Sequence, residues 1–225
     1  MNKFNELKEE FISIFSGRGI LLLDSVVPVA VFLIANPLFG VDIALWAALA
    51  AAGAFAVIRI ARRESLIYAL AGFGGVVLAA VFVQLSGSEA GFYLPGFIGS
   101  AITIVLCVVS VLINRPLVAW TSHITRRWPR QWYWHPRVLP AYNEVTIFWA
   151  AAFAAQLGLE YWFYQQEALN SLGIARILFG WPFTVILLVI TYLYGLWRLG
   201  NLGGPSVEEF KSGAEPPWEG QKRGF

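Results

Sequence analysis

DIALWAALAAAGAFAVIRIA, residues 42–61, is an apolar stretch whose only charged members are Asp42 at its start and Arg59 near its end. A bilayer core about 30 Å thick is crossed by a helix of about 20 apolar residues, so this stretch is long enough to span a membrane. Half of its residues are alanine or glycine. Small residues let helix backbones approach closely in lipid, so we predict that this helix lies at the centre of a bundle.

Five further apolar runs have about the same length as this one. Hydrophobic residues make up 58% of the chain and charged residues 13%, whereas a soluble domain has about 25% charged residues. In lipid every backbone polar group needs an internal partner, and the runs lack the alternation of barrel strands. The sequence therefore predicts an all-α fold, a polytopic transmembrane helical bundle of six helices. The other five runs are residues 20–39, 66–85, 97–114, 141–164 and 173–197.

Positive charge alternates along the chain. Fifteen of the sixteen Lys and Arg residues lie in the N-terminal segment, in the connections after the second and fourth runs, and after the sixth run. The connections after the first, third and fifth runs carry none, and Arg176, just inside the sixth run, is the exception. The positive-inside rule produces this alternation, so we expect both termini in the cytoplasm. The sequence shows no cleavable signal peptide.

Two polar tails are expected to flank a transmembrane domain at residues 19–198. Residues 1–18 place Phe4, Leu7 and Phe11 at helical spacing, which predicts a cytoplasmic amphipathic helix that docks a partner or anchors at the membrane surface. Residues 199–225 are rich in Gly, Pro and charge, and we expect a disordered cytoplasmic tail. The connection 86–96 is expected to be a short, flexible outer turn with interfacial aromatic residues.

The longest internal connection, residues 115–140, mixes tryptophan with arginine, and no acidic residue occurs between Glu89 and Glu144. Tryptophan prefers the headgroup level and arginine prefers anionic lipid, so we predict that this cytoplasmic loop lies on the inner leaflet and contacts anionic lipid headgroups. A net charge of +2 is too small to indicate a nucleic-acid partner. The predicted lipid-interface residues are Trp120, Arg126, Arg127, Trp128, Arg130, Trp132 and Trp134.

Polar residues inside apolar runs are costly, which makes each of them a functional candidate. Asp24 precedes Pro28 by one turn, and it either forms a cation or proton site with the carbonyl that Pro28 frees or pairs with an arginine. Glu160 and Arg176 lie at similar depth in the fifth and sixth runs, which predicts an ion pair of structural or substrate-binding role. The candidate binding residues are Asp24, Asn36, Gln156, Glu160 and Arg176.

Sequence motifs for catalysis and metal binding are missing. The chain has no Gly-rich phosphate loop, no Asp-rich magnesium motif, no His-Glu metal motif and no Gly-x-Ser-x-Gly elbow. His123 and His135 lack partners at ligand spacing, and the single Cys107 allows no intrachain disulfide. We therefore expect no enzyme activity, no cofactor and no metal.

Several short motifs occur in a fixed order over about residues 17–197. They are Gly17-Arg18-Gly19 followed by Ser25 and Pro28, then Arg62-Arg63-Glu64-Ser65-Leu66, Leu94-Pro95-Gly96, Arg115-Pro116-Leu117 and Gly180-Trp181-Pro182. The order of these motifs resembles a bacterial family of multi-pass membrane proteins, domain of unknown function 3159. The resemblance implies a protein of the bacterial cytoplasmic (inner) membrane without an assigned activity.

Two functions are compatible with this sequence. Residues 65–74 and 171–180 share five of ten positions, which would be an inverted repeat of the kind found in transporters, although the other runs show no such match. With the buried charges, this favours a small transporter or permease for an ion or small solute, and a homodimer is a candidate assembly. The alternative is a non-catalytic membrane scaffold, or an accessory subunit of an envelope or membrane complex, that docks partners through its N-terminal helix and its Trp/Arg loop.

Overall fold

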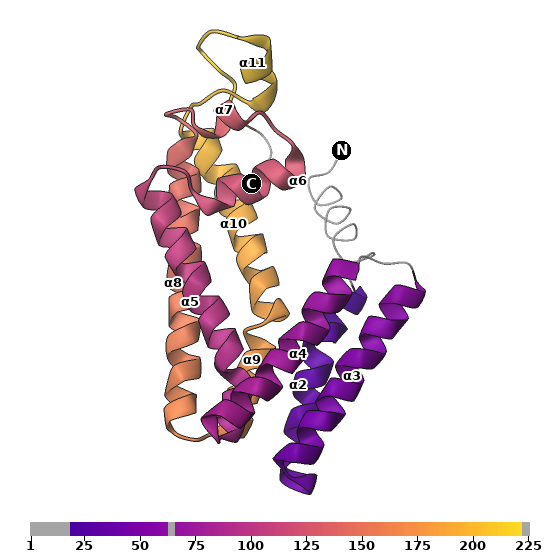
Figure 1. Cartoon of the computed structure of the whole chain (residues 1–225). Coiled ribbons are helices and arrows are strands. Elements are labelled where there is room, and N and C mark those ends of the chain that lie inside the picture. The colour runs from indigo at the N-terminus through magenta and orange to yellow at the C-terminus, as the bar shows by residue number, and fades with distance from the viewer. Residues whose placement is uncertain (1–18, 63–65, 222–225) are drawn as a thin grey trace. The chain divides into compact units, whose positions relative to one another are not determined.

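The computed structural model describes residues 19–62 and 66–221, with side chains for 27–62, 73–180 and 182–221. Over these residues the chain forms helices and no strand, which confirms the all-α class (Figure 1). The chain divides into two compact units. One unit comprises the residues up to Pro95 together with Phe163–Trp181, and the other comprises Gly96–Trp162 and the residues from Pro182 onward. The amphipathic helix expected at residues 1–18 lies outside the described residues.

The first unit consists of three long helices, a short 3-10 helix and one helix from later in the chain. These elements are α2 (Gly19–Phe39), α3 (Val41–Ala61), α4 (Leu66–Ser86), η1 (Glu89–Tyr93) and α9 (Leu169–Leu178). Gly40 alone separates α2 from α3, and its φ of +82° is a left-handed conformation that glycine adopts without a steric cost. α3 packs against both α2 and α4. The central position in the whole bundle that we predicted for the alanine-rich helix stays a prediction.

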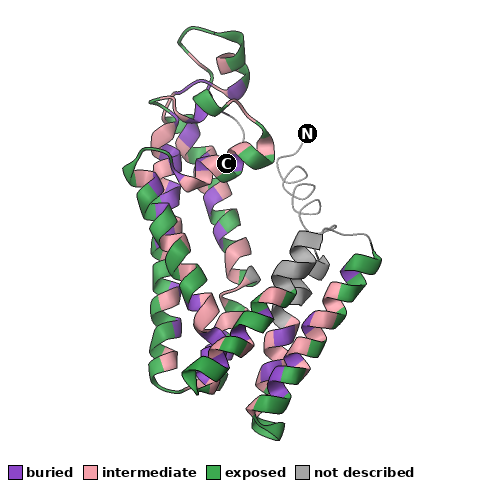
Figure 2. Ribbon diagram, viewed as in Figure 1, coloured by how far each residue is buried: buried purple, intermediate pink, exposed green. Residues whose placement is uncertain are grey.

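The alanines of α3 form its buried face. Ala44, Ala48 and Ala52 recur every fourth residue and are buried, so neighbouring backbones approach closely along this stripe. The other face of α3 is apolar but exposed, with Trp46 at 74% and Val57 at 66% of their full accessible surface (Figure 2). A helix with an exposed apolar face of this kind is suited to contact with lipid rather than water.

The 86–96 connection is a packed turn, and the expectation of a flexible turn with interfacial aromatic residues is wrong. The Ser88 hydroxyl accepts a hydrogen bond from the Ala90 N–H at 3.3 Å and so caps η1. Phe92 stacks on Phe32 of α2 with ring centroids 4.2 Å apart, and Phe92 and Tyr93 are both buried. A side chain on Gly91 would overlap the backbone of α4, which explains the glycine there.

The second unit contains three further long helices, α5, α8 and α10, and the polar end of the chain. The short helices α6 and α7 lie between α5 and α8 in the sequence. Its elements are α5 (Leu94–Leu112, whose first two residues belong to the first unit), α6 (Leu117–Arg126), α7 (Arg130–Tyr133), α8 (Leu139–Gln165, whose last three residues belong to the first unit), α10 (Trp181–Asn201, whose first residue belongs to the first unit) and α11 (Val207–Ser212).

The sixth apolar run is divided between two helices. α9 ends at Leu178 and α10 begins at Trp181, whereas the sequence predicted one helix over residues 173–197. Pro182 lies in the first turn of α10, where its missing N–H removes no intrahelical hydrogen bond. The matching stretch of the third run is continuous helix from Leu66 onward, so the two similar segments do not share one local structure.

Among the residues that the structure describes, three segments are long and apolar enough to cross a membrane, namely Val41–Ala61, Glu89–Leu112 and Leu169–Asn201. Where side chains are described, Val27–Phe39 and Phe73–Ser86 are shorter apolar helical segments, and they belong to α2 and α4. These helices are compatible with a membrane protein. The count of six membrane-spanning helices and the cytoplasmic termini stay predictions.

We predict that Ala48→Leu destabilises the first unit by about 1–3 kcal/mol, because a larger side chain on the buried stripe forces α3 away from its neighbours. Thermal unfolding of the purified protein in detergent measures the effect. Ala50→Leu is the matched control, since Ala50 is exposed on the same helix. Equal stability of the two variants would show that the alanine stripe does not hold this unit together.

Candidate functional site

The five candidate binding residues are divided between the two units. Asn36 and Arg176 belong to the first unit, and Gln156 and Glu160 belong to the second. Asp24 lies in α2, but its side chain is outside the described residues. The ion pair between Glu160 and Arg176 would join different units and stays a prediction.

Asn36 is hydrogen-bonded to a carboxylate that the sequence did not single out. Its side-chain amide, near the end of α2, donates to Glu89 Oε2 at the start of η1. The side-chain oxygen of Asn36 is buried and has no hydrogen-bond partner. Glu89 was overlooked because it lies in a connection that appeared flexible from its Gly and Ser content. The stacking of Phe32 on Phe92 brings the two segments together and so positions this polar pair.

Gln156 and Glu160 form the most deeply buried polar pair of the second unit. Gln156 Nε2 donates to Glu160 Oε1 at 2.9 Å, one helical turn along α8, and the Glu160 side chain is fully buried. Gln156 Oε1 is buried without a hydrogen-bond partner, and so is the indole N–H of Trp149, about two turns earlier on the same face. Carboxylate and amide oxygens accept hydrogen bonds and bind cations, so this face of α8 can offer oxygen ligands.

A third carboxylate, Glu144, is held by two side chains of α10. Arg198 donates from Nε and Nη2 to the two carboxylate oxygens at 2.7 and 2.6 Å, and the Tyr194 hydroxyl donates at 2.5 Å. This two-pronged geometry is the strongest arrangement between arginine and carboxylate. It fastens α8 to α10. The pairing was not predictable from sequence, because the residues are 54 positions apart and no local spacing relates them.

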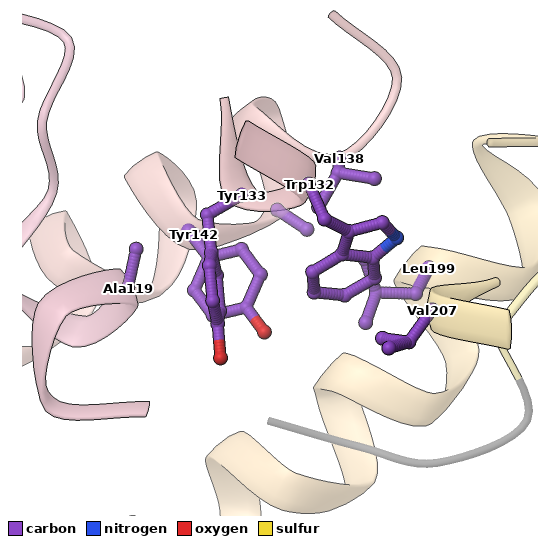
Figure 3. Close-up of a cluster of buried hydrophobic side chains, with 8 residues drawn as sticks. Ala119, Trp132, Tyr133, Val138, Tyr142, Leu199 and Val207 are labelled. Atoms are coloured by element: carbon purple, nitrogen blue, oxygen red, sulfur yellow. The ribbon is translucent and has the colours of Figure 1, made fainter. Parts of the chain in front are cut away.

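The polar end of the second unit has a hydrophobic core of its own. We call residues 115–142 together with 199–221 the head. Tyr133 lies 5.1 Å from both Trp132 and Tyr142, measured between ring centroids in edge-to-face geometry, and its hydroxyl is 3.1 Å from the Ser122 hydroxyl. The buried cluster (Figure 3) comprises Ala119, Trp132, Tyr133, Val138, Ala141, Tyr142, Leu199 and Val207.

The C-terminal segment closes this core. We call residues 205–221 the clasp. The indole N–H of Trp132 donates to the Pro205 carbonyl at 2.8 Å, across 73 positions of sequence, and Val207 of α11 is buried in the cluster. The Gln221 side chain accepts from the Val207 N–H at 3.2 Å, and the Arg137 guanidinium lies 5.6 Å from the Trp218 ring centroid. These contacts order the clasp.

Two sequence expectations differ from this arrangement. The residues from 199 to 221 are ordered, whereas we expected a disordered tail, because Val207 and the Trp132 hydrogen bond supply burial that composition alone did not indicate. We predicted that Trp132 contacts lipid headgroups, but its side chain is fully buried in protein. Trp120, Trp128 and Trp134 are half-buried, and Arg127 and Arg130 are exposed.

Arginine stacks on tryptophan around the junction of α6 and α7. We call Trp120, His123, Arg126, Trp128 and Arg130 the arginine–tryptophan face. The Arg126 guanidinium carbon is 5.1 Å from the Trp128 ring centroid, and that of Arg130 is 5.9 Å from the Trp120 ring centroid. His123 Nδ1 lies 2.7 Å from the Trp128 carbonyl and ties α6 to the following loop. Stacking holds each guanidinium plane against a ring while its N–H edge can bind an anion.

One carboxylate of the clasp has a strongly shifted pKa. Glu209 accepts from the Ser206 N–H at 2.7 Å and from the Glu219 N–H at 2.8 Å, while its own N–H donates to the Ser206 hydroxyl at 3.2 Å. These hydrogen bonds, the one from Ser206 first, lower the pKa of Glu209 from 4.5 to about 2. The capping box at the start of α11 thus depends on an ionised carboxylate.

We predict that Trp132→Ala opens the head, because removing a buried tryptophan costs about 3–5 kcal/mol and also removes the hydrogen bond to Pro205. Trypsin should then cleave after Lys211 in α11 many-fold faster than in the wild type, as followed by mass spectrometry. Trp197→Ala, on an exposed part of α10, is the control and should leave this cleavage rate unchanged. Slow cleavage of the Trp132 variant would contradict the assigned role of the indole.

We predict that the clasp loosens in acid. A lowered folded-state pKa means that the Glu209 carboxylate stabilises the clasp above about pH 4.5, and that this stabilisation is lost as the pH falls toward 2. A spin label at Glu215→Cys, in a Cys107→Ala background, should gain mobility over this interval. In Glu209→Gln the label should already be mobile at pH 6, whereas the adjacent control Glu208→Gln should behave as wild type. Identical titrations of all three proteins would exclude the role of Glu209.

Comparison with known proteins gives one result. The model of the family described as protein of unknown function (DUF3159) matches residues 17–196, which is most of the chain. No curated protein and no solved structure matches. The match covers α2 to most of α10 and confirms the resemblance seen in the sequence motifs. This chain belongs to the DUF3159 family.

Proposed function

We propose that this protein is a small transporter of the cytoplasmic membrane that moves a monovalent cation, with Glu160 and Gln156 in the path of the ion. The observation that carries the proposal is the buried pair on α8, in which a carboxylate is hydrogen-bonded to an amide whose oxygen has no partner. Ionisable residues within apolar helices are expensive and recur along ion pathways and proton relays.

The chemistry of the pair favours a cation over an anion. Glu160 supplies a carboxylate, and Gln156 turns its N–H toward that carboxylate and leaves its oxygen available. Both oxygens attract a proton, Na⁺ or K⁺, whereas an anion would meet two acceptors. Asn36 and Glu89 repeat the combination of an amide and a carboxylate in the first unit, again with a buried amide oxygen that lacks a partner.

The charge pattern predicts how the protein is oriented across the membrane. Six spans with both termini in the cytoplasm would place the head, with its arginines, on the inner leaflet. The Glu144–Arg198 pair then lies at the cytoplasmic end of α8, and Glu160 lies sixteen residues, about 24 Å, toward the outer side. This spacing separates a structural carboxylate near the head from the proposed ion-binding carboxylate.

We predict that the protein reconstituted in liposomes conducts at least one of H⁺, Na⁺ and K⁺, and that Glu160→Gln lowers this flux at least about tenfold. Gln156→Leu, which keeps the carboxylate, should lower it as well. Glu167→Gln removes an equal charge from an exposed position and serves as the control. Fluxes equal to those of empty liposomes for all three ions, or a flux unaffected by Glu160→Gln, would refute the proposal.

A scaffold is the second candidate, and the ordered head favours it. A bundle that only conducts ions does not require a separate core at one end, whereas an ordered end offers a partner a fixed surface to bind. The two functions make different demands on Trp132, because opening the head should abolish docking and leave an ion path through α8 intact. Retained flux in the Trp132→Ala protein would therefore assign transport to the helices and leave docking to the head.

A further inference from the structure

We propose that the arginine–tryptophan face binds the phosphate of an anionic phospholipid in the membrane leaflet next to the head. This inference does not depend on transport. It starts from the two stacked arginines, Arg126 on Trp128 and Arg130 on Trp120, which lie on either side of His123 at the junction of α6 and α7. A stacked guanidinium loses little freedom when it binds, and its planar N–H edge matches two oxygens of a phosphate.

The charge of this region is of one sign. Arg127, in the left-handed conformation that ends α6, is exposed next to Arg126, and Arg130 is exposed as well. No acidic residue occurs in the sequence between Glu89 and Glu144, so the segment that carries the face has only positive charges. The face is therefore complementary to a phosphate group.

The position of the face selects a lipid over a soluble phosphate. α5 ends at Leu112, the last residue of a segment long and apolar enough to cross a membrane, and α6 begins at Leu117. The face begins at Trp120, eight residues after that segment, and in a membrane this would place it near the headgroups. Ile124 on α6 is 72% exposed, and an exposed isoleucine next to arginines suits insertion among acyl chains.

The same residues explain why tryptophan accompanies each arginine. An indole at the headgroup level has an apolar ring and a polar N–H, so it suits both sides of the interface. The cation–π contact holds the guanidinium above the indole ring. Trp128 also contacts the buried cluster of the head, with its ring centroid 5.3 Å from that of Trp132. The ordered head thus holds the lipid-binding arginines in place.

The test is a titration of the purified full chain in detergent with phosphatidylglycerol or phosphatidylcholine, followed by native mass spectrometry. The wild type should bind phosphatidylglycerol more tightly than phosphatidylcholine. Arg126→Gln/Arg130→Gln should weaken phosphatidylglycerol binding about 25-fold, since each arginine near a lipid surface contributes about fivefold. Arg62→Gln/Lys211→Gln removes the same charge from two exposed positions outside the arginine–tryptophan face and should change binding less than twofold.

A conservative variant keeps the test decisive if the double glutamine variant is unstable. Arg126→Lys/Arg130→Lys retains the charge but loses the planar stacking, and it should bind phosphatidylglycerol with an affinity between those of the wild type and the glutamine variant. Equal binding of the two lipids by the wild type, or equal losses in the Arg126/Arg130 and Arg62/Lys211 variants, would overturn the proposal. So would tighter binding of inorganic phosphate or of a single-stranded oligonucleotide than of phosphatidylglycerol.

Discussion

The need to give carboxylates a partner among apolar helices governs this structure. Glu144 is held by Arg198 and Tyr194, Glu160 by Gln156, and Glu89 by Asn36. In lipid an unsatisfied carboxylate is far more costly than in water, so each pair constrains the helices that carry it. The pairs also differ in a way that bears on function. Glu144 is satisfied on both oxygens by α10, whereas the two amides keep a buried oxygen without a partner.

The head is a small, ordered region at the polar end of the second unit. Its core is small, but its members come from α6, α7, the start of α8, the end of α10 and α11. α6, α7 and the start of α8 adjoin in sequence, whereas the end of α10 and α11 are far from them. Contacts between these two groups therefore also fix the ends of α8 and α10. Aromatic rings in edge-to-face geometry fill this core. Burial raises the pKa of the Tyr133 phenol, so the phenol stays protonated and its hydroxyl can share a hydrogen bond with the Ser122 hydroxyl. The arginines lie outside this core and remain at the surface.

Apolar length and charge pattern were sufficient to predict most of the helices. Runs such as 42–61 and 66–85 agree with α3 and α4 within a residue or two, because long apolar segments leave the backbone few alternatives to helix. The prediction of flexibility failed at 86–96 and beyond 199, where glycine and proline suggested loose chain. There a few side chains, Phe92 on Phe32 and Val207 in the head, provide burial that no local pattern reveals. The partners of Asn36 and Glu144 were missed for the same reason, since they depend on contacts between distant segments.

The hydrogen bond from the Trp132 indole to the Pro205 carbonyl can form only after both residues have been synthesised. The indole emerges from the ribosome 73 residues before the carbonyl that covers it, and α8 and α10 are made in between. The head therefore remains unfinished until synthesis has passed Pro205. A product that stops short of Pro205 would leave the Trp132 indole without its acceptor and without the neighbouring Val207 that helps to bury it.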